Sequence, residues 1–327
     1  MARVFIDGFE AGDAKLWENV SGATVSAAST YGMDGSYCIY MAEYQYITKT
    51  LPSASEYYLA FIYRPTNTNN TLNIMQYFSG ATQIAMLTRN VSTYVLEARR
   101  GAGGGTLLAS SATTLIVNTN YLIEVRYKPA DSGGVFQVKI NGALEINFSG
   151  DTTDGATTID SLRFGCSPNS TWGWMAYDNI IVDDAAWIGN TRIQAIVPTG
   201  AGNSAQLTPS TGNNWACVDE KPPSETDYVS TNVVDQLDTY AAGDLAGTIG
   251  TVKCVQVQTL AKAEGAPTPT NFKLAVRVGG TDYLSTNKPP LTISKQLYAV
   301  WETNPNTAAA WTEAGVNGME FGVKSAA

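Results

Sequence analysis

The chain has 327 residues and a formal net charge of −9, with 20 basic residues, 29 acidic residues and no histidine. This length is enough for two domains with separate cores, and the sparse charge predicts short strands joined by turns rather than exposed helices. The missing histidine excludes Ser-His-Asp and Cys-His catalysis as well as histidine-bound metals. No basic patch supports nucleic-acid binding, and no apolar run is long enough for membrane insertion.

Strand patterns begin at the N-terminus and recur along the first half of the chain. Residues 4–6 form the first apolar run, and no signal peptide precedes them, so we expect the chain to mature in the cytoplasm of the cell that makes it. Residues 57–63 are apolar on both faces, which is typical of a central strand. In residues 121–127 the odd-numbered side chains are all aliphatic or aromatic, which predicts a half-buried strand.

Residues 136–148 predict a β-hairpin around an Asn-Gly pair. A two-residue loop would place Val138 opposite Glu145, which mixes a core side chain with a solvent-facing one. A three-residue loop over residues 140–142 places Val138 opposite Leu144 and supplies a glycine where a left-handed residue is needed. We therefore predict the three-residue loop.

The domain boundary is predicted after residue 187, which gives a first domain over residues 1–187 and a second over residues 188–327. Before the boundary, residues 176–184 predict the closing strand of the first domain. After it, residues 192–197 predict a new strand that ends at a proline.

The second domain is predicted to be the smaller one and rich in β-structure. Its clearest strand is residues 272–278, where apolar side chains alternate with Lys273 and Arg277. Residues 233–245 are the one stretch that indicates a short helix.

The chain offers no catalytic constellation. The glycine-rich residues 101–105 lack the Lys-Ser/Thr that completes a P-loop, so they predict a hairpin tip. Glu225 and Asp227 form a Glu-x-Asp pair, but no third acidic residue follows and two prolines precede them, which favours solvated loop acids over glycosidase carboxylates. We therefore predict a non-enzymatic protein with no catalytic residues.

The four cysteines, Cys38, Cys166, Cys217 and Cys254, are widely separated and include no Cys-x-x-Cys pair. Without histidine, a zinc site is not expected, and buried thiols are the favoured interpretation. A disulfide between Cys217 and Cys254 is the alternative.

Trp172 and Trp174 stand two residues apart on a predicted strand and therefore share a face. Indole faces stack on sugar rings, so the pair is a candidate glycan-binding platform. Burial in the core is the alternative, because aromatic side chains dominate the cores of β-sandwiches.

The first half of the chain resembles jelly-roll carbohydrate-binding and lectin-like domains. Residues 5–12, followed by Trp17, are similar to the first strand of such domains, and residues 177–182 are similar to their closing strand. Residues 121–151 are similar to a laminin-G-like strand-turn-strand pattern. The resemblance spans residues 4–184 and implies a laminin-G or concanavalin-like jelly-roll β-sandwich.

The second half resembles the C-terminal half of tailed-phage and prophage structural proteins whose N-terminal half is a lectin-like domain. The matching motifs are Gly189-Asn-Thr-Arg-Ile-Gln, Pro198, residues 207–212, Trp215, residues 218–220, residues 227–230, Trp301, Asn304-Pro305, Trp311 and residues 318–322. Together the two halves imply a virion structural protein.

The expected fold is therefore all-β, with an N-terminal lectin-like jelly-roll β-sandwich followed by a second, smaller β-rich domain. The expected function is that of a non-enzymatic phage virion surface protein, as a tail, neck or fibre component or as head decoration, assembled in the host cytoplasm. Its partners would be copies of itself, as a trimer or as many copies on a particle lattice, together with other virion proteins and host surface glycans. A carbohydrate-binding module without a virion role and a glycan-cleaving enzyme of the same fold are the alternatives.

The resemblance also implies a structural calcium ion. In related jelly rolls, the glutamate of the first Phe-Glu element and the aspartate of the closing strand often meet at one metal, and Glu10 and Asp178 occupy these positions. Calcium binds oxygen ligands and needs no histidine. The alternative is that Glu10 caps local backbone amides or faces solvent while Asp178 makes a turn hydrogen bond.

Overall fold

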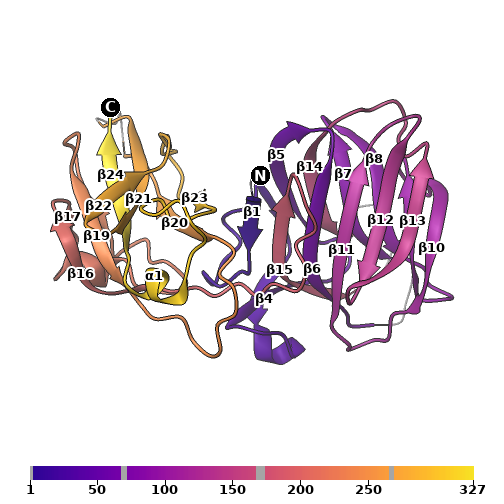
Figure 1. The fold of residues 1–327 in the computed structure, drawn as a ribbon, viewed down its shortest axis with the longest axis horizontal. Helices are drawn as coiled ribbons and strands as arrows, with labels where there is room; N and C mark the ends of the chain where they lie inside the picture. Colours follow the sequence, from indigo (N-terminus) through magenta and orange to yellow (C-terminus); the bar gives the residue numbers. More distant parts are fainter. Residues whose placement is uncertain (1–2, 68–71, 167–173, 265–268) are drawn as a thin grey trace. The chain divides into compact units, whose positions relative to one another are not determined.

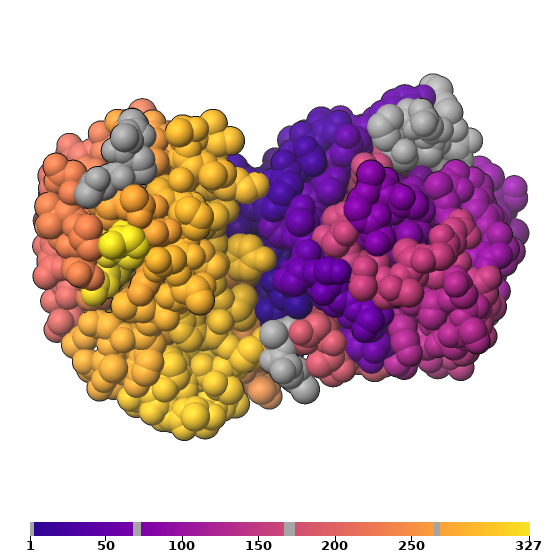
Figure 2. All heavy atoms as spheres, turned by 90° about the horizontal axis from the view of Figure 1, so that it is seen from above, coloured from indigo at the N-terminus to yellow at the C-terminus, as the bar shows by residue number. Residues whose placement is uncertain are grey.

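The computed structural model describes residues 3–67, 72–166, 174–264 and 269–327. The chain divides into two compact units, Met1–Ile193 and Gln194–Ala327, hereafter unit 1 and unit 2. Unit 1 runs from indigo to pink and unit 2 from orange to yellow in the ribbon and space-filling views (Figures 1 and 2). No helix in the described ranges has the length and apolar character needed to cross a membrane.

The division into units falls a few residues after residue 187, because the intervening segment bonds to unit 1. The Gly189 amide donates to Glu124 Oε1 at 2.8 Å, and the Ile193 amide donates to Asn179 Oδ1 at 2.8 Å. The segment that follows the closing strand therefore stays attached to that strand and to its sheet.

Unit 1 is a sandwich of two antiparallel sheets. Within the described ranges, the first sheet has eight strands in the order β13-β12-β11-β6-β15-β4-β3, with β1 also paired to β15. Its strands are β1 (Arg3–Asp7), β3 (Thr24–Ala27), β4 (Tyr37–Met41), β6 (Tyr57–Pro65), β11 (Tyr121–Lys128), β12 (Gly134–Ile140), β13 (Ala143–Gly150) and β15 (Met175–Asp183). A short 3-10 helix, η1 (Ala28–Tyr31), links β3 to β4.

The second sheet has seven described strands in the order β10-β9-β8-β7-β14-β5-β2. They are β2 (Asn19–Ser21), β5 (Tyr46–Ala54), β7 (Leu72–Ser79), β8 (Thr82–Arg89), β9 (Val95–Arg100), β10 (Thr106–Thr114) and β14 (Ile159–Gly165). The glycine-rich residues 101–105 join β9 to β10, as the sequence predicted for a hairpin tip.

Aromatic rings from the two sheets meet in the core. Tyr77 of β7 lies 4.4 Å, centroid to centroid, from Tyr127 of β11, and Phe164 of β14 packs edge-on against Phe61 of β6 at 5.2 Å. All four side chains are fully buried. Such rings supply the large apolar area that holds a sandwich together. The architecture confirms the expected all-β, lectin-like jelly-roll fold.

The strand predictions for unit 1 are largely confirmed. The strand β6 lies between β11 and β15 in the middle of its sheet. In β11, Ile123, Val125 and Tyr127 are fully buried, and Tyr121 is nearly so. The first and last strands pair through β1 and β15, which brings the two ends of the domain together.

The predicted three-residue hairpin loop is wrong. Ile140 pairs with Ala143, so the loop has two residues, and Asn141 and Gly142 both have positive φ angles, 51° and 86°. These angles suit the tight hairpin turn that an Asn-Gly pair favours. The register then shifts so that Val138 pairs with Ile146, because a β-bulge adds one residue to β13. A two-residue turn is therefore compatible with Val138 facing an apolar partner on the buried side of the hairpin.

Unit 2 has a five-stranded antiparallel sheet in the order β16-β19-β24-β21-β22 and two smaller two-stranded sheets among its described residues. The main sheet contains β16 (Pro198–Ala205), β19 (Leu237–Ala242), β21 (Asn271–Val278), β22 (Thr281–Leu284) and β24 (Glu320–Ala326). The smaller sheets pair β17 (Thr208–Pro209) with β18 (Val229–Ser230) and β20 (Val255–Ala261) with β23 (Lys295–Trp301), and the helices are η2 (Asn214–Cys217) and α1 (Glu313–Asn317).

The core of unit 2 lies between the main sheet and the pair β20–β23. Leu274 and Val276 of β21 pack with Val255 and Val257 of β20 and with Trp311. The predicted alternation in residues 272–278 is thus confirmed.

Two sequence predictions for unit 2 are wrong. Residues 192–197 are not a strand: the Gln194 side chain bonds to the backbone of Ala246 in both directions, and strand pairing starts only at Pro198. Residues 233–245 contain β19 rather than a helix. Asp235 has a φ of 68°, a left-handed conformation that ends any helix there, and the following residues pair with β16 and β24.

Candidate functional site

A continuous line of side chains crosses the outward face of the seven-stranded sheet. Directly paired residues of antiparallel strands point to the same face. The line, hereafter the outer row, consists of Thr48 (β5), Arg163 (β14), Gln76 (β7), Met86 (β8), Arg99 (β9) and Leu107 (β10). Their chain neighbours Tyr77 and Phe164 point the other way, into the core between the sheets.

The outer row contains buried polar atoms without partners. Gln76 is fully buried; its Nε2 donates to the Gly165 carbonyl at 3.3 Å, but its Oε1 has no hydrogen bond. Thr48 Oγ1 and Arg163 Nε are also buried without a hydrogen bond. A buried polar atom without a partner costs about 1–3 kcal/mol. Three such atoms lie on consecutive paired residues, which makes this row a candidate site for a polar ligand.

Arg163 is held between two aromatic rings. Its guanidinium carbon lies 4.5 Å from the centroid of Tyr46 and 4.8 Å from that of Phe78. Burial lowers the pKa of the Arg163 guanidinium. Across the part of the chain that the structure describes, Arg163 has no hydrogen bond and no ion pair. The two rings hold the side chain, while its buried Nε has no hydrogen-bond partner.

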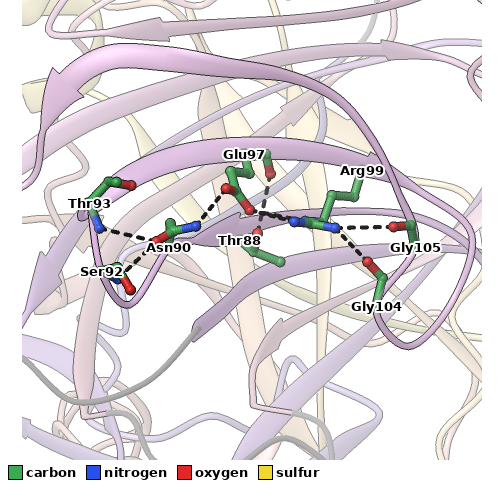
Figure 3. A network of polar contacts seen from close by, with 8 residues as sticks. All are labelled: Thr88, Asn90, Ser92, Thr93, Glu97, Arg99, Gly104 and Gly105. Carbon is green, nitrogen blue, oxygen red and sulfur yellow. Dashed lines mark hydrogen bonds and ion pairs between the residues drawn. The ribbon is translucent and has the colours of Figure 1, made fainter.

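The other arginine of the outer row is fully engaged (Figure 3). Arg99 Nη2 pairs with Glu97 Oε2 at 2.8 Å, and its Nη1 donates to the carbonyls of Gly104 and Gly105. The other carboxylate oxygen of Glu97 accepts a hydrogen bond from Asn90 Nδ2 at 2.7 Å. This network fixes the β9–β10 tip and leaves Glu97 without a free oxygen for acid-base work.

A second polar cluster lies where the ends of the domain meet. Glu10 accepts hydrogen bonds from the amides of Ser36 and Tyr37, at 2.9 and 3.3 Å to Oε1. Asp178 Oδ1 accepts from the Asn179 amide at 2.6 Å, whereas its buried Oδ2 has no partner. Glu10 thus bonds to amides distant in the sequence rather than to local ones, and Asp178 bonds to the amide of the next residue.

The electrostatics of this cluster are unusual for carboxyl groups. Burial raises the pKa of Asp178 to about 8; the Asn179 amide opposes the shift, and the negative charges of Glu10, Asp34 and Asp7 add to it. Burial likewise raises the pKa of Asp7 to about 7, against the hydrogen bonds donated by Phe9 and Trp17. We refer to Asp7, Glu10, Asp34 and Asp178 as the acid cluster.

The acid cluster suits a hard cation in charge and ligand chemistry. The orphaned Asp178 Oδ2 beside a second carboxylate supplies the kind of oxygen that calcium binds. Within the described ranges, however, no group of three or more Cys, Asp or Glu side chains has the geometry to hold a metal ion. Calcium binding by Glu10 and Asp178 therefore stays a prediction, and it would need further oxygen ligands from carbonyl groups and water.

Of the predicted glycan platform, only one member falls within the described residues. Trp174 precedes β15 and is 45% exposed, and its carbonyl accepts a hydrogen bond from the Thr66 amide at 2.9 Å. Trp172 lies outside the described residues. Trp174 lies next to β15 of the eight-stranded sheet, whereas the outer row lies on the seven-stranded sheet. Sequence reasoning did not identify the outer row. The sequence shows Arg163 only as a charged residue between the apolar residues Leu162 and Phe164.

The remaining candidates have structural surroundings. Glu225 and Asp227 lie in a loop, as expected, and accept hydrogen bonds from Ser294 and Ser210. Cys217 is a buried thiol that donates to the Thr211 carbonyl, so the alternative disulfide with Cys254 is not formed.

No protein-family model matches this chain, and no curated protein is similar to it in sequence. Among solved structures, a sialidase matches 56% of this chain with 18% of its own length, at 14% identity and a TM-score of 0.43. A protein of unknown function with a galectin-like fold from Bacillus subtilis matches 57% of this chain with 98% of its own, at 14% identity and a TM-score of 0.40. A carbohydrate-binding module from Bacillus subtilis matches 50% of this chain with 97% of its own, at 11% identity and a TM-score of 0.33.

Proposed function

We propose that this chain is a non-enzymatic, glycan-binding surface protein, and that unit 1 binds the glycan on its outer row. The observation that carries the proposal is the set of unpaired polar atoms on Thr48, Gln76 and Arg163, which are direct neighbours across three strands. Sugar hydroxyls both donate and accept hydrogen bonds, so they match the chemistry of the partners that these atoms lack. The rings of Tyr46 and Phe78 lie beside them and offer surface for stacking.

A binding role rather than turnover is supported by the charge pattern of the outer row. Hydrolysis of a glycosidic bond usually needs two carboxyl groups that flank it. The carboxylate next to this row, Glu97, is held by Arg99 and Asn90. Release of reducing sugar from a host envelope by the purified protein would overturn the non-enzymatic assignment.

The place of action that we propose is the surface of a phage virion, as a tail, neck or fibre component, with head decoration as the alternative. The motifs of the second half, from Gly189 to Gly322, support this through their resemblance to phage structural proteins. Copies of the chain itself and other virion proteins would be its partners, assembled in the host cytoplasm. Immunogold labelling of particles tests the assignment, and unlabelled virions from a lysate that contains the protein would contradict it.

Glycan binding is tested with two nearly isosteric variants, Thr48→Val and Gln76→Met, on a glycan array followed by titration calorimetry. Each variant removes one unpaired polar atom, so we expect affinity to fall about tenfold. Thr48→Val should be as stable as the wild type or more stable, whereas Gln76→Met also loses the hydrogen bond to the Gly165 carbonyl and should be about 1 kcal/mol less stable. The control is Gln137→Met on β12, whose side chain already bonds to Asn147. Silence across the array, or unchanged binding in both variants, would refute the proposal.

A further inference from the structure

Arg163 differs in its partners from three other arginines of unit 1 that lie near aromatic rings or on the same sheet face. Arg89, over the ring of Tyr94, has no carboxylate either, but it donates to the carbonyls of Asn67 and Leu115. Arg126, on the opposite sheet, lies 5.5 Å from the ring centroid of Tyr58 and pairs with Glu56. Arg99, on the same row, pairs with Glu97. Arg163 has the aromatic contacts without a carboxylate, so a partly buried positive charge is left uncompensated among the described residues. Burying an unpaired charge is costly unless a partner arrives.

The geometry around Arg163 limits what that partner is. A guanidinium with rings against it can use only its edge, and that edge presents donors in a planar fork that matches a carboxylate or a sulfate. Its direct cross-strand neighbours are Thr48 on one side and Gln76 on the other. Their free atoms are a hydroxyl and an amide oxygen, which suit sugar hydroxyl groups rather than a second charge.

We propose that the outer row selects acidic glycans: Arg163 binds a carboxylate or sulfate group of the sugar, while Thr48 and Gln76 bind adjacent hydroxyl groups. This inference rests on the proposed glycan-binding function and adds the class of ligand. It identifies Arg163 as the residue that determines specificity.

The charges nearby do not compete for Arg163. Glu18, close to the β5 end of the row, pairs with Lys49 at 3.1 Å, and Glu97 pairs with Arg99. The chain as a whole carries a net charge of −9, which repels polyanions in general. Binding of an acidic glycan therefore has to arise from a local cation, and a single substitution should remove it.

The test uses matched probes that differ only in charge. The probes are tetragalacturonate with its fully methyl-esterified form, and dextran sulfate with unsulfated dextran. Calorimetry on the full chain compares the wild type with Arg163→Met, Arg163→Lys and the control Arg126→Met. We expect the wild type to bind at least one charged probe about tenfold or more tighter than its neutral partner. Arg163→Met should abolish this preference.

The variants separate charge from geometry. Arg163→Lys keeps the charge but loses the planar fork, so we expect a partial preference, whereas Arg126→Met should bind as the wild type does. Equal binding of charged and neutral probes, or a loss of preference in Arg126→Met as large as in Arg163→Met, would overturn the inference while leaving glycan binding intact. Failure of every glycan on the array to bind would instead refute the proposed function itself.

Discussion

Replacing Asp178 with asparagine should change how the stability of unit 1 depends on pH. In the folded chain burial raises the pKa of Asp178 from its ordinary value of 3.8 to about 8. The stabilising contribution of the protonated group is therefore fully present below pH 3.8 and is lost as pH rises towards 8. Between pH 5 and 7 the folded state holds one proton more than the unfolded state. This difference lowers stability by about 1.4 kcal/mol per pH unit, or about 2.7 kcal/mol across the interval.

The Asp178→Asn variant removes this titration without removing the local bond, because an amide oxygen still accepts from the Asn179 amide. We expect the wild type to lose stability from pH 5 to 7 more steeply than the variant. A weaker slope should remain in the variant, because the pKa of Asp7 is raised to about 7 and contributes in the same direction.

The assay is urea unfolding at pH 5, 6, 7 and 8 in the presence of a chelator. Asp131→Asn, which changes an exposed aspartate in a turn, serves as the control and should follow the wild type. Identical slopes for wild type and Asp178→Asn, or a wild type that gains stability from pH 5 to 7, would refute the assignment of a buried protonated carboxyl.

Three further outcomes are expected. Calcium should raise the melting temperature of the wild type but not of Asp178→Asn, and an unchanged midpoint after chelation would exclude an ion at the acid cluster. Asp238→Ala should destabilise unit 2 by about 3 kcal/mol in urea unfolding. The reason is that the buried Asp238 carboxylate accepts hydrogen bonds from two backbone amides and two side chains. The control Asp244→Ala, which changes an exposed aspartate, should have little effect. Trp174→Ala should leave glycan binding on the outer row unchanged in calorimetry, because Trp174 lies outside that row; an affinity about fivefold weaker would instead assign this exposed indole to the site.

Much of the fold of unit 1 could be predicted from side-chain alternation. Strands such as β11 carry apolar residues at every second position because one face meets the core. The hairpin register could not be predicted, because two preferences conflicted locally. An Asn-Gly turn favours two residues, whereas the buried face needs Val138 opposite an apolar partner; a bulge satisfies both. A bulge leaves no mark in the hydrophobic pattern of either strand alone.

The alternating pattern gave wrong strand predictions where hydrogen bonds to distant residues take the place of pairing with a neighbouring strand. Residues 192–197 alternate as a strand does, yet Ile193 and Gln194 bond to Asn179 and Ala246 instead of to a neighbouring strand. Alternation indicates which residues have two different faces, but it does not show that a partner strand exists. The same limitation explains β19, where pairing with β16 and β24 decides the conformation.

The candidate site illustrates why alternation along one strand is insufficient for function. Along β14, Arg163 between Leu162 and Phe164 has the pattern of an ordinary solvated residue on the outer face of a sheet. Its chemistry depends on two other strands, since Tyr46 of β5 and Phe78 of β7 contact its guanidinium while no carboxylate of the described residues pairs with it. A surface arginine with a partner is commonplace, and one held by rings with unsatisfied donors is not. Because that distinction lies entirely in cross-strand neighbours, a sequence-based search finds exposed tryptophans first and overlooks the arginine.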